Sequence, residues 1–76
     1  MKIIVEAAGW LKRFTSGRSE LELDLPENAS AIKAAATAGI PESETGFLIV
    51  NGKKVDGAYV LKDGDTVKVY SHIIGG

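Results

Sequence analysis

Cysteine is absent from this chain of 76 residues. Its absence excludes a disulfide framework, an iron–sulfur cluster held by thiolates and a cysteine nucleophile. Charge of either sign is nearly balanced at a net −1, because nine Lys and Arg residues stand against ten Asp and Glu residues. A chain with this net charge lacks the excess of basic residues that binding to nucleic acids or anionic membranes requires, so we expect neither as a partner.

Long hydrophobic runs are missing as well. The apolar stretch near the N-terminus is interrupted at Glu6, which makes it too short for a signal peptide or a membrane span. We therefore expect a cytoplasmic protein. The single histidine, His72, has no spaced cluster of partner ligands, so the sequence predicts no metal site. No nucleophile–base pair is visible either, and a stand-alone enzyme is not predicted.

What is present suffices for one small core. The hydrophobic fraction is 45%, and a domain of this length buries about 60% of the surface of its unfolded chain. Residues 2–8 alternate between two faces as a strand does, and residues 19–25 place leucines on one face and acids on the other. The second strand should pair antiparallel with the first at a sheet edge, where exposed acids discourage further pairing. Residues 9–17 between them form a long connection, with Trp10 as a core or loop anchor.

An alanine-rich run at residues 31–38 predicts a helix, because alanine has the highest helix propensity. Asn28 or Ser30 would cap its start, and Gly39 suits the position just past its end. The helix is short and would be marginal alone, so it must lie against a sheet. The residues expected on its core-facing side are Ile32, Ala35 and Ala36.

The last third of the chain predicts three more strands. Residues 47–50 are β-prone, and Asn51-Gly52 is a strong hairpin signal that leads into a return strand at 53–55. Residues 65–70 alternate again. The element order predicts an α+β fold, with a mixed sheet of four to five strands and one main helix. The first and last strands are the most apolar, so we expect them to be parallel neighbours in the centre.

Three motifs then carry a family resemblance. They are Val50-Asn51-Gly52-Lys53, the segment 61–65 (Leu-Lys-Asp-Gly-Asp) followed by Val67 and Val69, and Gly75-Gly76 at the end of the sequence. With the element order, they resemble the β-grasp, ubiquitin-like sulfur carriers of molybdopterin and thiamine biosynthesis (the MoaD/ThiS group). The resemblance implies a β-grasp domain over residues 1–70 and a flexible tail over residues 71–76.

The resemblance also implies a chemistry. In that family, a partner related to ubiquitin-activating enzymes uses ATP and Mg²⁺ to adenylate the terminal carboxylate. A persulfide then displaces AMP, and the resulting thiocarboxylate donates sulfur to an acceptor synthase subunit. Gly76 would accordingly be the reactive end, Gly75 would keep the approach narrow, and the chain itself would bind no cofactor. Residues 70–74 lack the prolines that molybdopterin-type carriers often have, so molybdopterin, tungstopterin, thiamine, tRNA-thiolation and amino-acid routes all stay open.

One sheet face should be free of the helix and expose large apolar groups, a feature that usually marks an interface. We expect the partner-binding residues on this face and in the tail: Ile4, Phe47, Ile49, Tyr70, His72, Ile73 and Ile74. Two alternatives remain open. One is a ubiquitin-like modifier that is joined to a target lysine through its C-terminal glycine. The other is a non-covalent β-grasp binding module whose tail is dispensable.

Overall fold

The computed structural model describes residues 1–72. The described elements, in chain order, are β1 (Lys2–Ala7), the 3₁₀ helix η1 (Gly9–Thr15), β2 (Glu20–Asp24), α1 (Ala31–Thr37), the 3₁₀ helix η2 (Glu42–Glu44), β3 (Phe47–Val50), β4 (Lys53–Val55) and β5 (Thr66–Tyr70). The predicted tail residues Ile73, Ile74, Gly75 and Gly76 lie outside the described residues. Within the described part, no helix is long and apolar enough to cross a membrane.

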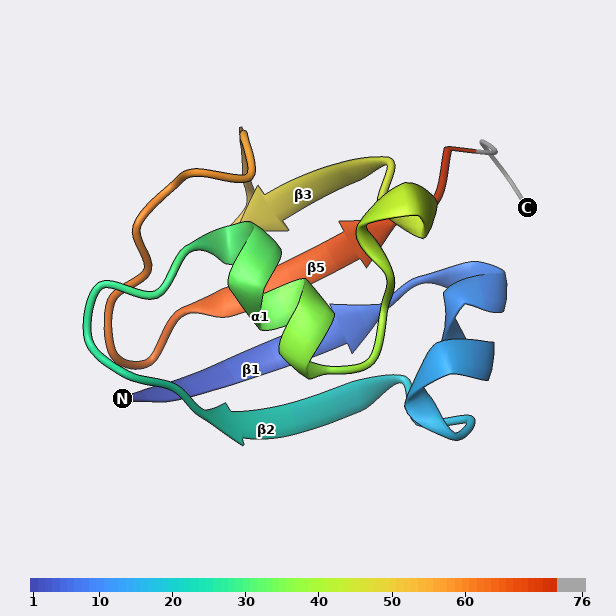
Figure 1. The fold of residues 1–76 in the computed structure, drawn as a ribbon, viewed down its shortest axis with the longest axis horizontal. Helices are drawn as coiled ribbons and strands as arrows, with labels where there is room; N and C mark the ends of the chain where they lie inside the picture. The colour runs from blue at the N-terminus through green and yellow to red at the C-terminus, as the bar shows by residue number, and fades with distance from the viewer. Residues whose placement is uncertain (73–76) are drawn as a thin grey trace.

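The five strands form one mixed sheet in the order β2-β1-β5-β3-β4. β1 and β5 are parallel central neighbours, and every other adjacent pair is antiparallel. Helix α1 crosses one face of this sheet (Figure 1). The predicted α+β, β-grasp architecture is therefore confirmed, including the central parallel pair.

The core lies between the sheet and α1. Alternate residues of the central strands, such as Val5 and Val67, are almost completely buried, and each side chain of this size contributes about 1.5–3 kcal/mol when removed from water. The helix meets them with alanines that lack side-chain bulk, so its backbone approaches the sheet closely. The buried alanines are Ala31, Ala34 and Ala35 of α1 and Ala38, its C-cap.

The predicted face of the helix was therefore partly wrong. Ala35 is buried as expected, but Ile32 is only half-buried and Ala36 is exposed. The buried alanines follow the i, i+3, i+4, i+7 spacing of one helix face. Five of the eight residues 31–38 are alanine, which gives the run little hydrophobic contrast, so its sequence does not reveal which face turns inward.

The ends of α1 follow the predicted capping chemistry. Ser30, rather than Asn28, is the N-cap, and its hydroxyl oxygen accepts a hydrogen bond from the Lys33 backbone N–H at 3.2 Å. Gly39 follows the helix with φ of +105°, a conformation that favours glycine. A Cβ at Gly39 would also lie 2.5 Å from the Phe14 carbonyl oxygen, so η1 and the end of α1 pack backbone to backbone.

The connection at residues 9–17 is more ordered than expected, because Gly9–Thr15 forms η1. Leu11 is fully buried in the core. The Thr15 hydroxyl bridges the carbonyl oxygens of Lys12 and Arg18, which closes the following turn. Trp10 lies against Phe14 with 6.1 Å between ring centroids, so it anchors the loop as predicted.

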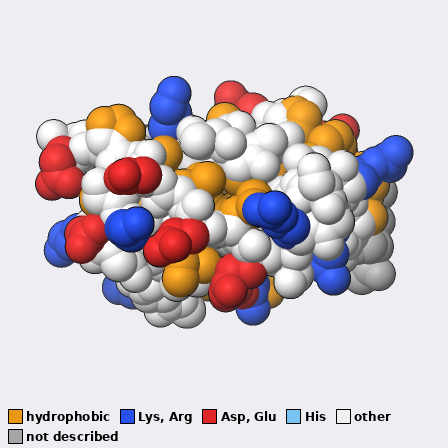
Figure 2. Space-filling view, turned by 90° about the horizontal axis from the view of Figure 1, so that it is seen from below, with side chains coloured by type: hydrophobic (Ala, Val, Ile, Leu, Met, Phe, Trp, Pro, Cys, Tyr) orange, Lys and Arg blue, Asp and Glu red, His pale blue; other side chains and the backbone are white. Residues whose placement is uncertain are grey.

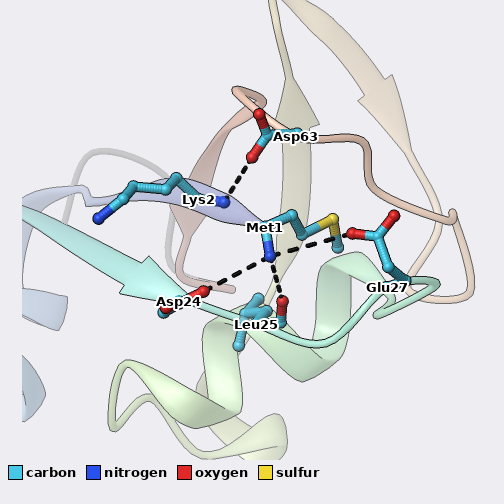
Figure 3. Close-up of polar contacts among 6 residues, drawn as sticks. All are labelled: Met1, Lys2, Asp24, Leu25, Glu27 and Asp63. Atoms are coloured by element: carbon cyan, nitrogen blue, oxygen red, sulfur yellow. Dashed lines mark hydrogen bonds and ion pairs between the residues drawn. The ribbon is translucent and has the colours of Figure 1, made fainter.

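The start of β1 is held from two sides (Figure 3). The Lys2 backbone N–H donates to an Asp63 carboxylate oxygen at 2.7 Å, and the Met1 ammonium donates to the Leu25 carbonyl oxygen at 2.7 Å. Asp24 and Glu27 add carboxylates at 3.4 and 3.9 Å from the same ammonium. These contacts join β1 to the end of β2 and to the turn that precedes β5.

Candidate functional site

The sheet face opposite α1, called the open face below, carries the side chains that the sequence predicts for docking. Strand register places Ile4 of β1, Phe47 and Ile49 of β3, and Tyr70 of β5 on this face. All four are half-buried, because neighbouring strands cover part of each side chain. The structure thus locates them where expected, and their role in binding stays a prediction.

Three of these residues form a continuous group, which we call the aromatic patch: Phe47, Ile49 and Tyr70. Phe47 and Tyr70 are directly opposite each other in the ladder, and their rings stack with centroids 4.6 Å apart and planes 7° from parallel. The Lys54 ammonium of β4 lies 5.4 Å from the centre of the Phe47 ring, within the range of a cation–π contact. Lys54 was not singled out from the sequence, since only the β3–β4 register brings it beside Phe47.

Ile4 is separated from the aromatic patch. It lies opposite Thr66, whereas Ile49 lies opposite Lys68, so two polar side chains of β5 stand between them. The Lys68 ammonium also pairs with the Glu6 carboxylate at 3.7 Å. The apolar surface is therefore smaller than the sequence suggested, and it is centred on β3 and β5.

Charge is distributed unevenly across the open face. At the β2 edge, Glu20, Glu22 and Asp24 lie on the same face as Ile4 and Glu6 because they pair with β1 in register. The lysines of this face are Lys2 of β1, which pairs with Asp24, Lys68 of the central strand β5, and Lys54 of the edge strand β4. Figure 2, viewed onto the β2 edge, shows acidic side chains over the left and centre of the molecule with basic side chains among them and hydrophobic surface between them. A complementary partner would therefore present basic groups toward β2 and acidic groups toward β4.

The chain leaves the sheet beside the aromatic patch. Tyr70 is the last residue of β5, and its carbonyl oxygen accepts a hydrogen bond from the Gly46 N–H at 2.7 Å. Ser71 is still buried, whereas His72 is exposed. The end of β5 and η2 lie at the same end of the molecule (Figure 1). His72 thus lies next to the predicted docking residues, while Ile73, Ile74, Gly75 and Gly76 lie outside the described residues.

A groove of about 1070 Å³ begins at the same place and was not foreseen from the sequence. Ile32 of α1, Val55 of β4 and Phe47 contribute apolar walls, and His72 lines it near the exit of the chain. Sequence reasoning also missed two exposed hydrophobic side chains in the β4–β5 connection, Tyr59 and Val60. No hydrophobic periodicity marks that irregular segment, so only the structure reveals their exposure.

Chemistry-bearing side chains are sparse among residues 1–72. No three His, Asp or Glu side chains of this part lie close enough together to hold a metal ion. Trp10 Nε1 is the one buried side-chain nitrogen or oxygen in the same range that has no hydrogen-bond partner. The described residues therefore offer a partly apolar open face and a chain exit that is hydrogen-bonded to Gly46.

Comparison with known proteins agrees with this geometry. The family model described as Mut7-C ubiquitin matches residues 1–73. A search of curated proteins found no relative that matches the sequence.

Solved structures have the same fold. A putative molybdopterin converting factor subunit 1 from Pyrococcus furiosus is 25% identical, with a TM-score of 0.75 over 92% of this chain and 95% of that one. Small archaeal modifier protein 1 of Haloferax volcanii is 12% identical, with a TM-score of 0.73 over the same shares, 92% and 95%. A complex of subunits 1 and 2 of molybdopterin-converting factor from Helicobacter pylori contains a chain that is 18% identical, with a TM-score of 0.63 and full coverage of both chains.

Proposed function

Because the chain belongs to the Mut7-C ubiquitin family, with the resemblance to ubiquitin-like sulfur carriers confirmed, we propose that it is a sulfur carrier. In this proposal the Gly76 carboxylate is adenylated and converted to a thiocarboxylate. A small ubiquitin-like protein of this kind fits a carrier rather than a catalyst. The similarity to the P. furiosus protein, a putative molybdopterin converting factor subunit, favours the molybdopterin or tungstopterin route over the thiamine route.

The proposed reaction overcomes the low reactivity of a carboxylate. An oxygen of the Gly76 carboxylate attacks the α-phosphorus of ATP, the α–β phosphoanhydride bond breaks, and pyrophosphate leaves with the electron pair. The terminal sulfur of a persulfide then attacks the acyl carbon and expels AMP. A thiol finally cleaves the remaining S–S bond, which releases the thiocarboxylate and forms a disulfide. ATP, Mg²⁺, persulfide and thiol all belong to partner proteins, and we place this cycle in the cytoplasm.

In this scheme the open face of the chain supplies recognition. Stacked aromatic side chains at the centre of a surface are typical of residues that dominate binding energy. Lys54 beside Phe47 would contribute a charge that favours an acidic partner surface. We propose that this face binds two partners in turn, an adenylating enzyme related to ubiquitin-activating enzymes and a sulfur-acceptor synthase subunit. The H. pylori complex of subunits 1 and 2 supports the second kind of partner.

One observation carries the proposal most directly: the aromatic patch and the chain exit are adjacent. The Phe47–Tyr70 stack lies at the last residue of β5, and His72 follows within two residues. A partner that docks on the patch therefore meets the chain leading to Gly76 without any rearrangement of the sheet. This arrangement suits a carrier whose reactive end must enter a partner's active site.

A ubiquitin-like modifier is the second candidate, favoured by the similarity to small archaeal modifier protein 1. The same adenylate would then be attacked by a lysine amine of a target protein, which forms an isopeptide bond. Intact mass after expression beside the cognate adenylating enzyme separates the two functions. A gain equal to the exchange of one oxygen for sulfur supports the carrier, and covalent adducts of much higher mass support the modifier. Persistence of only the unchanged mass would contradict both.

A further inference from the structure

Gly46 lies against the point where the chain leaves the sheet, and the approach is between backbones. A Cβ built on Gly46 would lie 2.5 Å from the Ser71 carbonyl carbon and 2.7 Å from the His72 nitrogen, and it would also overlap the Ser71 carbonyl oxygen. Cβ atoms in proteins essentially never come within 3.0 Å of such atoms. Only glycine therefore fits at position 46 while Ser71 and His72 keep their places.

The surroundings leave little room to relieve such a clash within the sheet. The Gly46 N–H is bonded to the Tyr70 carbonyl oxygen at 2.7 Å, and the next residue pairs directly with Tyr70 in the β3–β5 ladder. β5 is in turn held by β1 on its other side. On the other side of position 46, the Thr45 N–H is bonded to the Glu42 carbonyl oxygen within the turn of η2. The segment Ser71–His72 follows the last ladder pair, so it is the part of this contact that can move without breaking the sheet.

We infer that Gly46 is a positioning residue that sets the direction in which the chain leaves β5 toward its reactive end. This inference rests on the proposed function, because that direction matters only if the terminal carboxylate must reach a partner's active site. Gly46 touches neither ATP nor the carboxylate in this scheme. It acts by allowing Ser71 and His72 to lie against the start of β3.

Substitution of Gly46 by alanine should separate docking from chemistry. To reach ordinary van der Waals contact at 3.4 Å from the present 2.5 Å, one backbone must move by about 0.9 Å. A displacement of about 1 Å in a reacting group can lower a rate by about a hundredfold. We expect Gly46→Ala to lower kcat for ATP–pyrophosphate exchange by up to about a hundredfold, the effect of passing the whole shift on to the carboxylate, while the KM for the carrier stays near the parental value. Phe47→Ala should show the opposite pattern, with a raised KM and a nearly unchanged kcat.

Gly17→Ala is the matched control. Gly17 has φ of +80°, and a Cβ at this position would have no atom within 4 Å, so alanine there strains the backbone without displacing a neighbour. It should lower thermal stability while leaving kcat and KM unchanged. Equal losses of kcat in the two variants would show that general destabilisation is responsible, and the positioning role would be overturned.

A readout on the free protein makes the test independent of the partner. In the parent, nuclear Overhauser contacts should join the Gly46 α-protons to the His72 amide proton, and in Gly46→Ala the amide resonances of Ser71 and His72 should shift. Absence of the contact in the parent would overturn the inference even if the variant does not fold. If the parent is adenylated and Gly46→Ala matches it, the positioning role alone fails. If the parent is not adenylated at all, the proposed function fails, and the positioning role that rests on it fails too.

Discussion

Asp65 should be one of the most important polar side chains for stability, although it lies far from the proposed reactive end. It is 8% exposed, at the entrance to β5. One carboxylate oxygen accepts from the Asn51 side-chain amide and the other from the Lys62 backbone N–H, each at 2.8 Å. Asn51 also accepts a hydrogen bond from the Thr66 backbone N–H at 3.0 Å. This network joins the β3–β4 turn to the first residue of β5.

Replacing Asp65 by alanine removes both acceptor bonds. Hydrogen bonds to charged groups contribute about 1.5–3 kcal/mol each, and a buried donor left without a partner adds a desolvation cost. Asn51 and Lys62 are both exposed residues whose bonds to Asp65 are partly buried, so water can compensate part of each loss. We therefore expect a loss of about 2–4 kcal/mol in the free energy of unfolding. That loss is large for a domain of this size, whose total stability is about 4–11 kcal/mol.

Urea unfolding followed by circular dichroism measures this loss, and a thermal melt should show a fall in Tm of about 10–30 °C. Asp63→Ala is the matched control, because Asp63 is an exposed acid in the same turn with one hydrogen bond, from the Lys2 N–H. Its expected cost is about 0.5–1.5 kcal/mol. Equal costs for the two variants would refute the network as a main source of stability at this turn.

Three further predictions concern the proposed function. Phe47→Ala or Tyr70→Ala should each weaken binding to the adenylating enzyme by about 1–3 kcal/mol, as measured by titration calorimetry. The control Lys33→Ala, on the exposed surface of α1, should bind like the parent. Unchanged binding in both aromatic variants would show that the docking face lies elsewhere. Deletion of Gly76 shortens the chain by about 3.5 Å and should abolish ATP–pyrophosphate exchange without a change in Tm. Gly75→Ala should reduce turnover while docking persists, and parental exchange rates in the deletion variant would favour the binding-module alternative.

Strand positions were predictable because the alternation of apolar and polar residues and the turn motifs are local features of the sequence. Alternation at residues 2–8, 19–25 and 65–70, and the turn formed by Asn51-Gly52, place all five strands to within one residue of their observed bounds. The central position of β5 was predicted because β1 and β5 were taken as the most apolar strands, and the sheet order confirms it although Thr66 and Lys68 of β5 are polar. The predicted resemblance rested on these turns together with Gly75-Gly76.

The errors arose where local pattern is weak. The inward face of α1 could not be identified in a run of alanines, and η1 was hidden in a segment that reads as an irregular loop. Ile4 was grouped with Phe47 on the basis of shared strand parity. Register shows that Thr66 and Lys68 separate it from the aromatic patch. Parity assigns a residue to a face, but only the pairing of strands determines its neighbours on that face.

By itself, the sequence determined the order of elements, the two faces of each strand and the Gly75-Gly76 ending on which the proposed chemistry depends. Only the tertiary structure decided which side chains touch across strands, as Phe47 stacks on Tyr70 and Lys54 lies over Phe47. It alone also revealed the contact of Gly46 with Ser71 and His72. The physical reason is the separation in sequence of the residues involved. Turns and alternation depend on residues that are neighbours along the chain. The contacts across strands join residues that are distant in sequence and meet only when the sheet is assembled.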